Sequence, residues 1–447
     1  MSIQIPKKVK KIIDTLQGAG FEAYAVGGCI RDSLLGRVPN DWDITTSAEP
    51  RQVKALFMRT VDTGIQHGTV TVLMDKEGFE VTTYRIDGEY EDSRHPKEVQ
   101  FTTQIAEDLK RRDFTINAMA YNEKDGLVDL FGGREDLKNG IIRCVGDPEE
   151  RFTEDALRML RAIRFSAQLG YTIEPKTKDA IGRLAPTLEH ISAERIQAEM
   201  IKLLLSPHPD YLRIAYETNV TGVFFPEWDK AMETPQNHPH HCYSVGEHIL
   251  HSLPEVPPDK VLRLAMLLHD IAKPETLTTD DKGITHFHHH AAAGEELSRK
   301  ILRRLRMDND TTNKVCKLVR YHDYGNGVPA NSKLVRRIMN KIGEELFPSL
   351  LLVRKADILA QSDFKREEKL ANLEEWKNCY EEILRKGECV SLKTLAVSGR
   401  DLIAAGIEPG KMLGEVLERL LEEVLEDPDK NNKEYLLSLA LKTAKEP

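Results

Sequence analysis

Two aspartates separated by one residue follow a pair of glycines near the start of the chain. They lie in the stretch YAVGGCIRDSLLGRVPNDWDITT, which contains Gly27, Gly28, Arg31, Asp41 and Asp43. In an extended segment alternate side chains point to the same face, so both carboxylates would share one face. Paired carboxylates of this kind can hold two Mg²⁺ ions about 4 Å apart, one to activate a hydroxyl nucleophile and one to neutralise leaving pyrophosphate.

The glycines and the arginine around this acidic pair suit a bound triphosphate. Gly27 and Gly28 allow a tight turn and a close approach of backbone to phosphate. Arg31, three residues later, would offer a planar set of donors. An isolated Asp-x-Asp is usually a solvated turn, so the combination is what indicates nucleotidyl transfer. Glu80 is a candidate third carboxylate, although a surface strand position explains it equally well.

A second set of charged residues lies in the stretch EDALRMLRAIRF. Asp155, Arg158, Arg161 and Arg164 recur every three residues within a predicted helix from Phe152 to Gln168. This spacing places them on one gently drifting face of a helix. A solvated stripe with local ion pairs is the simpler interpretation of the segment alone.

The chemical interpretation of this stretch is selection of a nucleobase. Cytosine and adenine each present an amino donor beside a ring acceptor, which Asp155 and Arg158 would complement. Guanine and uracil present an acceptor in place of the amino group and would leave buried groups unpaired, which is costly. Arg112, in RRDFTIN, would join Arg161 and Arg164 in binding phosphates and orienting Asp155.

These motifs, in this order, make the whole chain resemble the class II CCA-adding tRNA nucleotidyltransferases of the DNA polymerase β superfamily. The Gly-Gly and DWD segments, RRDFTIN, DLFGG and EDALRMLR resemble that family's successive motifs. The resemblance implies that Asp41 and Asp43 are catalytic and bind Mg²⁺. It also implies that the incoming nucleotide contacts Gly28, Arg31, Arg112, Asp155, Arg158, Arg161 and Arg164.

Two further segments bear on which nucleotides are added. Residues 87–101 resemble the flexible loop that full CCA-adding members use in switching from C to A, and the segment GIQHGT at 64–69 also resembles their version. We therefore expect addition of C, C and A to tRNA from CTP and ATP. The alternative within the class is an A-adding enzyme or poly(A) polymerase.

Eleven of the fifteen histidines lie between His238 and His322. An ordered subset with two aspartates resembles the ligands of HD-domain phosphohydrolases, which converge from several helices on one or two divalent metals. The expected ligands of Ni²⁺ or Mn²⁺ are His248, His269, Asp270, His290, His322 and Asp357. An active phosphohydrolase or phosphodiesterase, an inactive metal-binding domain and a relic tRNA-binding surface all remain open. A hydrolase with an RNA-binding head is the alternative of another class.

The elements that must position these residues change character along the chain. The first part alternates helical and strand patterns, whereas strand signals almost vanish after Pro148. We expect an α/β nucleotidyltransferase head with a small mixed or antiparallel sheet, followed by an all-α neck, HD body and tail. The expected ranges are 1–147 for the head, 148–225 for the neck, 226–365 for the HD domain and 366–447 for the tRNA-binding tail.

Composition sets further limits on partners and location. The chain has 447 residues, a formal net charge of −9 and 40% hydrophobic residues. A uniformly basic coat is excluded, so any RNA contact must use local patches. Arg299 to Arg306 and Lys333 to Lys341 are the candidates, and a solvated helix face explains each of them equally well. We expect a cytoplasmic protein that binds neither membrane nor DNA, because there is no apolar signal core, no span of about 20 apolar residues and no CxxC pair.

Overall fold

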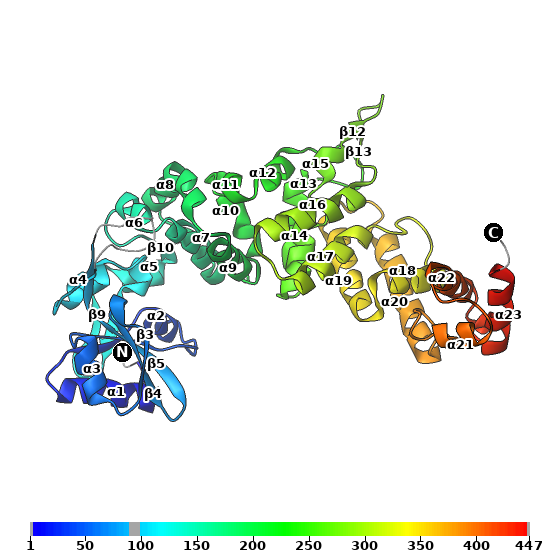
Figure 1. Ribbon diagram of the computed structural model, residues 1–447. Helices are drawn as coiled ribbons and strands as arrows, with labels where there is room; N and C mark the ends of the chain where they lie inside the picture. The colour runs from blue at the N-terminus through cyan, green and yellow to red at the C-terminus, as the bar shows by residue number, and fades with distance from the viewer. Residues whose placement is uncertain (1–2, 89–98, 445–447) are drawn as a thin grey trace. The chain divides into compact units, whose positions relative to one another are not determined.

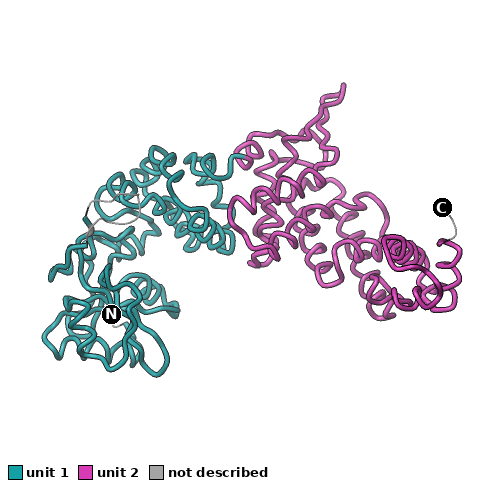
Figure 2. The backbone as a smooth tube through the Cα atoms, in the orientation of Figure 1, with its two compact units in different colours: residues 1–226 teal, residues 227–447 magenta. Residues whose placement is uncertain are grey.

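The computed structural model describes residues 3–88 and 99–444. The chain forms two compact units, residues 1–226 and 227–447, shown in different colours in Figure 2. The boundary between the units lies next to residue 226, where the HD domain was expected to start. The finer divisions after residues 147 and 365 stay predictions.

The first unit begins with a seven-stranded mixed sheet in the order β3-β4-β5-β2-β1-β8-β9. Figure 1 labels β3, β4, β5 and β9 of this sheet. Only β2 and β5 pair in parallel, and the other neighbours are antiparallel. The expected mixed sheet is therefore confirmed. The strands are β1 (Ala23–Val26), β2 (Asp43–Thr46), β3 (Thr60–Gly64), β4 (Thr69–Met74), β5 (Glu77–Thr83), β8 (Met119–Asn122) and β9 (Gly126–Asp129).

Strand β1 lies near the middle of the sheet because all four of its residues are apolar or aromatic and buried. Helix α1 (Lys7–Gly18) packs against it with an apolar stripe that includes Ile12 and Leu16. The other head helices are α2 (Gly28–Leu34), α3 (Pro50–Leu56), α4 (Ile105–Lys110) and α5 (Gly133–Asn139), with 3₁₀ turns η1 (Ile65–His67) and η2 (Thr115–Asn117). Because Val26 at the end of β1 lies opposite Asp43 at the start of β2, the loops after β1 and before β2 lie at the same end of the sheet.

The segment expected to switch nucleotides is only partly described. Strands β6 (Arg85–Asp87) and β7 (Val99–Phe101) pair antiparallel at its two ends. Residues 89–98 lie outside the described residues, so the loop assignment stays a prediction.

The single helix predicted from Phe152 to Gln168 is wrong, because the helix is broken at Asp155. Helix α6 (Pro148–Glu154) starts at the Asp147 cap, and Asp155 leaves it with extended backbone at φ −142° and ψ 102°. The Asp155 carboxylate then accepts a hydrogen bond from the Leu157 N–H at the start of α7 (Leu157–Leu169). Short polar side chains compete with helix continuation in this way.

The rest of the first unit is helical apart from one short parallel pair, β10 (Ile141–Ile142) and β11 (Thr172–Ile173). Gly170 ends α7 in the left-handed conformation, with φ 72°. The remaining elements are α8 (Pro175–Leu184), η3 (Ala185–His190), α9 (Ala193–Leu204), η4 (Pro209–Tyr211), α10 (Leu212–Glu217) and α11 (Thr221–Phe224).

The second unit is helical except for a small hairpin of β12 (Thr278–Thr279) and β13 (Thr285–His286). The fold class, an α/β head followed by a helical body, is confirmed. The elements before the tail are α12 (Pro226–Glu233), α13 (Val245–Ser252), η5 (Leu253–Glu255), α14 (Lys260–Leu268), α15 (Lys273–Thr276), α16 (His290–Arg304), α17 (Asn309–Tyr321), α18 (Ser332–Ile342), η6 (Glu344–Leu346), α19 (Phe347–Ala360) and α20 (Arg366–Lys386).

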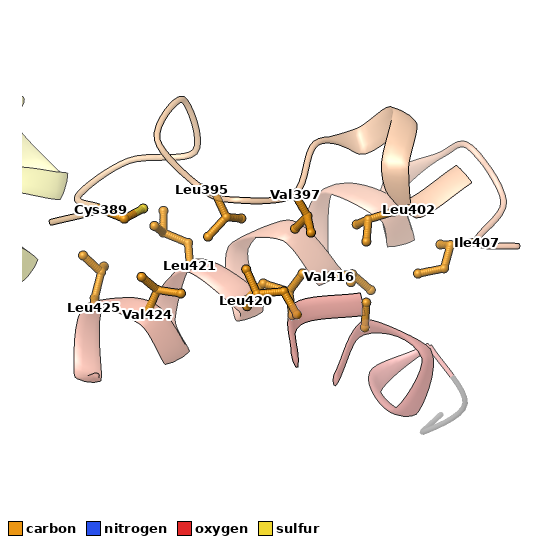
Figure 3. Packing of buried hydrophobic residues seen from close by; sticks show 12 residues of the cluster. Cys389, Leu395, Val397, Leu402, Ile407, Val416, Leu420, Leu421, Val424 and Leu425 are labelled. Carbon is orange, nitrogen blue, oxygen red and sulfur yellow. The ribbon is translucent and has the colours of Figure 1, made fainter. Parts of the chain in front are cut away.

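The end of the chain packs around its own apolar cluster, which Figure 3 shows. Leu402, Leu420 and Leu436 are fully buried there and come from three successive helices. These are α21 (Gly399–Ala404), α22 (Lys411–Glu426) and α23 (Lys433–Thr443), with η7 (Pro428–Lys430) between the last two. Among the described residues, no helix combines the length and the apolar character needed to cross a bilayer.

The basic patch predicted at Lys333 to Lys341, on α18, is not entirely exposed to solvent. Arg336 is only 4% exposed and donates to the carbonyl oxygens of Leu425 and Glu426 and to the Glu388 carboxylate. It therefore joins α18 to the tail instead of offering a phosphate contact.

Candidate nucleotidyl-transfer and metal sites

Three carboxylates lie together where β2 and β5 run side by side. Asp43 begins β2, and Asp41 precedes it by two residues. Because Ile44 lies opposite Val81 in the parallel pairing, Glu80 comes to the position beside Asp43. Burial raises the pKa of Glu80, and the negative charges of Asp43 and Asp41 raise it further. The structure thus brings the candidate third carboxylate to the predicted pair.

The acidic cluster has an excess of negative charge. Displacement of water by the surrounding protein raises the pKa of Asp43, and the Asp41 charge adds to this, while Arg112 acts in the opposite direction. A divalent cation bound by hard carboxylate oxygens would relieve this repulsion. The residues Asp41, Asp43 and Glu80 therefore fit a divalent cation.

The turn after β1 is shaped for close approach of backbone and cationic side chains. Gly27 has φ +84°, and a Cβ there would lie 2.9 Å from Arg112 Nη1. On α2, Arg31 donates through Nη1 to Asn117 Oδ1 at 2.7 Å and through Nε to Asp32 at 2.9 Å. Two guanidinium groups are thus held beside the glycine turn, next to the acidic cluster.

The Asp155 carboxylate is fixed from two sides at the break between α6 and α7. Its Oδ1 accepts from the Leu157 N–H at 3.1 Å, and its Oδ2 accepts from Arg195 Nη2 at 2.8 Å. Arg158 donates to the Glu154 carboxylate and, at 3.1 Å each, to the carbonyl oxygens of Arg151 and Arg111. The extended backbone at residue 155 and these two hydrogen bonds thus fix the Asp155 carboxylate at the start of α7.

Arg161 is held by a buried carboxylate on the segment RRDFTIN. Its Nε and Nη2 donate to Asp113 Oδ2 at 2.9 and 2.6 Å. Burial alone would raise the pKa of Asp113, but the charge and hydrogen bonds of Arg161 overcome this and lower it to about 2. This pair ties α7 to the head segment.

Arg164 is buried and bonded to the neighbouring helix. Its Nε donates to Glu199 on α9, and its Nη1 donates to Gln168 at 2.7 Å. The Arg164 guanidinium lies 3.8 Å from the centre of the Phe165 ring, which Arg31 also approaches at 5.0 Å. Nucleotide contacts by Arg161 and Arg164 stay predictions, because both side chains are bonded to protein carboxylates.

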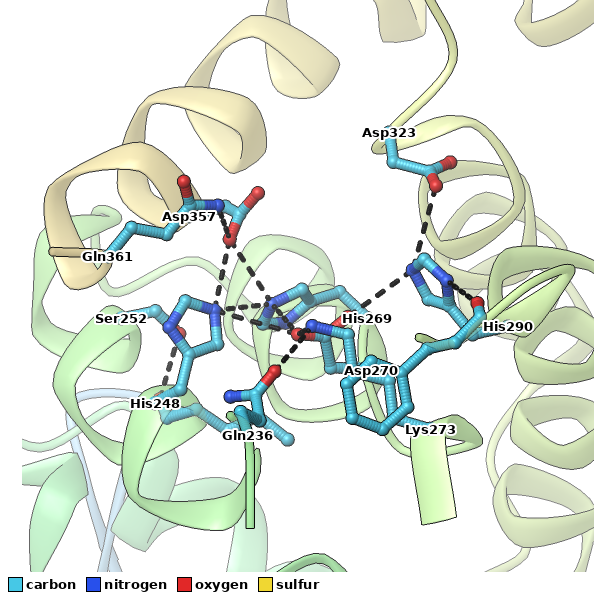
Figure 4. A network of polar contacts seen from close by, with 12 residues as sticks. Gln236, His248, Ser252, His269, Asp270, Lys273, His290, Asp323, Asp357 and Gln361 are labelled. Atoms are coloured by element: carbon cyan, nitrogen blue, oxygen red, sulfur yellow. Dashed lines mark hydrogen bonds and ion pairs between the residues drawn. The ribbon is translucent and has the colours of Figure 1, made fainter. Parts of the chain in front are cut away.

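In the second unit, the predicted histidine and aspartate ligands converge (Figure 4). His248 Nε2 lies 3.0 Å from Asp357 Oδ1 and 3.2 Å from His269 Nε2. Asp270 Oδ2 lies 3.3 Å from His269 Nε2 and 3.6 Å from His248 Nε2. These four side chains are buried, and they form the first of two adjoining groups.

Asp270 turns its other oxygen to the second group. Its Oδ1 lies 3.5 Å from His290 Nε2 and 3.6 Å from His322 Nε2. Those two nitrogens are 3.4 Å apart, and Asp323 Oδ2 lies 3.6 Å from His290 Nε2. One carboxylate is therefore shared by two sets of imidazoles, as in two-cation sites.

Each of the four imidazoles directs Nε2 into this cluster because its Nδ1 faces a backbone carbonyl. The pairs are His248 with Ala360 at 3.3 Å, His269 with Met266 at 2.7 Å, His290 with Phe287 at 2.8 Å and His322 with Val319 at 2.8 Å. A carbonyl at that position fixes the proton on Nδ1 and leaves Nε2 as the metal-binding atom.

The charge balance of the histidine cluster also fits a cation. Asp270 Oδ2 is buried and accepts no hydrogen bond of good geometry among the described residues, although Lys273 Nζ lies 2.6 Å away as a counter-charge. Burial would lower the pKa of His322, but its hydrogen bond to Asp270 and the charge of Asp323 raise it to about 9, so without a metal ion His322 carries a second proton that a bound cation would displace. Imidazoles mixed with carboxylates suit divalent transition metals such as Mn²⁺ and Ni²⁺.

Three family models match the chain. They are described as the poly A polymerase head domain (residues 23–143), a probable RNA and SrmB-binding site of polymerase A (170–232) and a putative tRNA nucleotidyltransferase domain 2 (275–440). The first covers the acidic cluster, and the last covers His290, His322 and Asp357 of the histidine cluster.

The chain is similar to curated proteins along nearly its whole length. A CCA-adding enzyme of Ligilactobacillus salivarius is 36% identical over 446 residues, covering 98% of this chain and 97% of the relative. The chain belongs to the CCA-adding enzymes.

Other similarities to CCA-adding enzymes differ in extent. One from Leuconostoc mesenteroides is 55% identical over 205 residues, covering 45% of this chain and 51% of the relative. In this and similar matches the chain spans about half the length of the curated relative. The crystal structure of the Bacillus stearothermophilus CCA-adding enzyme in complex with CTP has a TM-score of 0.75 and 30% identity, covering 98% of both chains.

Sequence reasoning missed several residues that build these sites in this CCA-adding family member. Arg195 holds Asp155, Asn117 holds Arg31, and Asp113 holds Arg161. Asn117 and Asp113 lie in the quoted RRDFTIN motif, so two polar residues inside that motif could have indicated a role in the site. Nothing in the sequence around Arg195 indicates that it contacts Asp155. Asp323 follows His322 directly, and an adjacent His-Asp pair could have indicated it. The HD assignment of the second unit stays a prediction.

Proposed function

We propose that this chain adds C, C and A to the 3′ ends of tRNA from CTP and ATP, without a nucleic-acid template. The observation that carries the proposal is the cluster of Asp41, Asp43 and Glu80 beside two held arginines, in a chain that belongs to the CCA-adding enzymes over its full length. The proposal includes a cytoplasmic location, where tRNA and both nucleotides are present.

The head would carry out the transfer itself. Mg²⁺ held by Asp41 and Asp43 would supply charge to activate the terminal ribose hydroxyl and neutralise the leaving pyrophosphate. Asn117 and Asp32 fix the Arg31 guanidinium, so its donors meet the triphosphate without reorganising. Positioning and fixed charge would then supply most of the rate enhancement.

The neck would select the base. Asp155, held by Arg195 and by the Leu157 N–H, keeps acceptor oxygens in a fixed place for the amino group of cytosine or adenine. Arg158 would donate to the adjacent ring nitrogen, which requires it to exchange one of its bonds to the carbonyl oxygens of Arg151 and Arg111. Guanine and uracil would leave Asp155 facing an acceptor, which accounts for their rejection.

Primer extension tests this function. The wild type should extend tRNA that ends before CCA with CTP and ATP, and should not use GTP or UTP. Asp43→Asn should lose roughly a thousandfold or more in rate, because the metal-binding charge is removed. Asp62→Asn is the matched control, because Asp62 lies on β3 of the same sheet and is paired with Lys54. An unchanged rate for Asp43→Asn would refute the assignment.

The same assay separates the alternative within the class. A poly(A) polymerase or A-adding enzyme would extend tRNA ending in CC with A, but would add no C to tRNA that lacks CCA. Incorporation of A alone would therefore favour that alternative over complete CCA addition.

We propose metal-dependent hydrolysis of a phosphate ester as a second function, centred on His248, His269, Asp270 and Asp357. It is supported by the four Nε2 atoms that face one shared carboxylate. A 3′ phosphate or 2′,3′-cyclic phosphate on tRNA is a suitable substrate, because its removal gives the head a free hydroxyl. Phosphatase assays with Mn²⁺ or Ni²⁺ on Asp270→Ala test this function, and unchanged turnover would refute it.

A further inference from the structure

Arg354 on α19 is a buried guanidinium with an incomplete set of partners. It is 4% exposed, and its one hydrogen bond among the described residues runs from Nη2 to Asn326 Oδ1 at 3.1 Å. Its Nε and Nη1 are buried without any hydrogen-bond partner. A buried cation with two unused donors is unfavourable unless something else satisfies them.

Two other buried arginines of the chain each donate to a carboxylate. Arg336, also 4% exposed, donates to Glu388 and to two backbone carbonyls. Arg164, 6% exposed, donates to Glu199 and to Gln168. Compared with these two, Arg354 lacks a hydrogen-bonded carboxylate, so burial in this fold does not by itself leave a guanidinium unpaired.

The position of Arg354 is beside the histidine cluster. It lines a cavity of about 820 Å³ together with His290, Asp323 and Asp357. Arg354 precedes Asp357 by three residues on α19, so both side chains lie on the same face of the helix. The cationic side chains Lys273, Lys365 and Lys369 line the same cavity. An anion bound in this cavity would therefore lie near Arg354 and near two of the predicted metal ligands, His290 and Asp357.

The stacking of Arg354 on Trp376 does not account for its unused donors. The guanidinium carbon lies 4.3 Å from the centre of the Trp376 ring. Such stacking uses the face of the guanidinium, whereas its N–H donors point outward in the plane of the group. The ring therefore holds the plane in a fixed orientation and leaves the donors for another ligand.

We infer that Arg354 is the phosphate-binding residue of the histidine-cluster site, and that the ligand is a phosphate ester of nucleotide size. The inference rests on the proposed hydrolase function. A phosphoryl group in this cavity would be held by the cations at the histidine cluster and by the Arg354 guanidinium. The cavity volume is within the usual range for nucleotide-sized ligands, roughly 300 to 1,000 Å³.

Titration of the full chain, loaded with Mn²⁺, with inorganic phosphate tests the inference by calorimetry. The wild type should bind phosphate, and Arg354→Met should bind it at least tenfold more weakly. The control is Lys314→Met, which also removes a cation from the same unit, because Lys314 is exposed and paired with Asp310. Phosphate bound in the head is common to all variants, so the difference between variants reports on the histidine-cluster site.

The controls separate a binding role from a structural one. Mn²⁺ affinity and the thermal unfolding midpoint should be unchanged in Arg354→Lys, which keeps the charge but loses the planar donors, while its phosphate affinity falls severalfold. This variant carries the test if Arg354→Met does not fold. In the wild type, 3′-AMP should displace the phosphate, and failure to displace it would overturn the assignment to an ester.

Two failures can be told apart. If the wild type does not bind Mn²⁺, the proposed hydrolase function is refuted and the inference falls with it. If Mn²⁺ binds but phosphate affinity in both Arg354 variants stays within twofold of the wild type, only the role of Arg354 is overturned. The nucleotidyl-transfer proposal is unaffected by either result, because primer extension measures it independently.

Discussion

At the scale of single residues, the base-selecting carboxylate depends on a neighbour that touches no reacting atom. Arg195 on α9 holds Asp155 Oδ2 at 2.8 Å, and both side chains are mostly buried. A carboxylate that must present acceptors in one direction loses discrimination if it can rotate. Arg195 is therefore a positioning residue in our proposal.

Arg195→Met should relax base selection in this proposal. We expect kcat/KM for CTP to fall about 10- to 100-fold, with a measurable rise in incorporation of UMP, because Asp155 is no longer held. Steady-state kinetics with all four nucleotides, one at a time, would measure both effects. Arg183→Met is the control, since Arg183 is exposed and paired with Glu149. Unchanged discrimination in Arg195→Met would exclude the positioning role.

The Asp113–Arg161 pair should make stability depend on pH. The folded-state pKa of Asp113, about 2, lies below its unfolded value of about 3.9, so the pair stabilises the fold above pH 4 and this contribution disappears as the pH falls toward 2. The difference in unfolding free energy between wild type and Asp113→Asn should be constant above pH 5 and shrink by about 2 kcal/mol between pH 4 and pH 2. Urea denaturation at a series of pH values measures it, and a gap that does not vary with pH would contradict the assignment.

At the scale of elements, the head places its arginines through the contact between η2 and α5. Gly133 starts α5, and a Cβ there would lie 2.1 Å from the Thr115 carbonyl oxygen. The same 3₁₀ turn carries Asn117, which holds Arg31. The distance between α5 and η2 therefore sets the position of a proposed phosphate-binding side chain.

Gly133→Ala should separate these two elements. We expect a loss of about 1–3 kcal/mol in stability from overpacking, with a fall in transferase activity as Asn117 moves. Gly182→Ala is the control, because Gly182 lies in helix α8 with no atom within 4 Å of an added Cβ, and alanine there should be neutral or stabilising. Equilibrium unfolding and primer extension on both variants give the comparison, and equal stabilities would contradict the packing argument.

Local patterns predicted the elements but not all of their ends. The mixed α/β head and the helical remainder followed from strand and helix patterns in the first part of the chain and helix patterns almost alone after Pro148. The break at Asp155 did not, because the segment has helical periodicity throughout, and only the capping of Leu157 shows where the helix stops. Glycine and proline mark boundaries in sequence, whereas an internal aspartate does so only in its context.

Contacts between distant segments account for the other gaps. Arg336 has the same local pattern as its exposed neighbours, and its burial depends on the tail more than 85 residues later. The unpaired donors of Arg354 follow from the packing of α19 against α20, which no local spacing expresses. By contrast, the Asp41–Asp43 pair was predictable because one short segment, which leads into β2, supplies both carboxylates.

At the scale of the whole molecule, the two candidate sites lie in different compact units. The acidic cluster lies within residues 1–226, and the histidine cluster lies within residues 227–447. Each set of ligands comes from its own unit, so each should bind its cation without the other. Loss of one proposed function should therefore leave the other in place.

Paired variants of the full chain should show this separation. Asp41→Asn should abolish CCA addition but keep Mn²⁺ binding to the histidine cluster, whereas His269→Ala should weaken that binding at least tenfold and leave CCA addition unchanged. Calorimetry and primer extension on the same preparations provide both measurements. A fall in CCA addition in His269→Ala, at unchanged unfolding temperature, would show that the units are coupled.

The turn at Gly27 limits how this chain can diverge. Gly20 and Gly27 both have positive φ, at +91° and +84°, but open space surrounds Gly20, while Gly27 faces the Arg112 side chain. Asparagine or aspartate can adopt such a backbone where there is room. In a saturation library selected for growth, the surviving variants should therefore include a few other residues at position 20, such as asparagine and aspartate. At position 27 only glycine should be recovered.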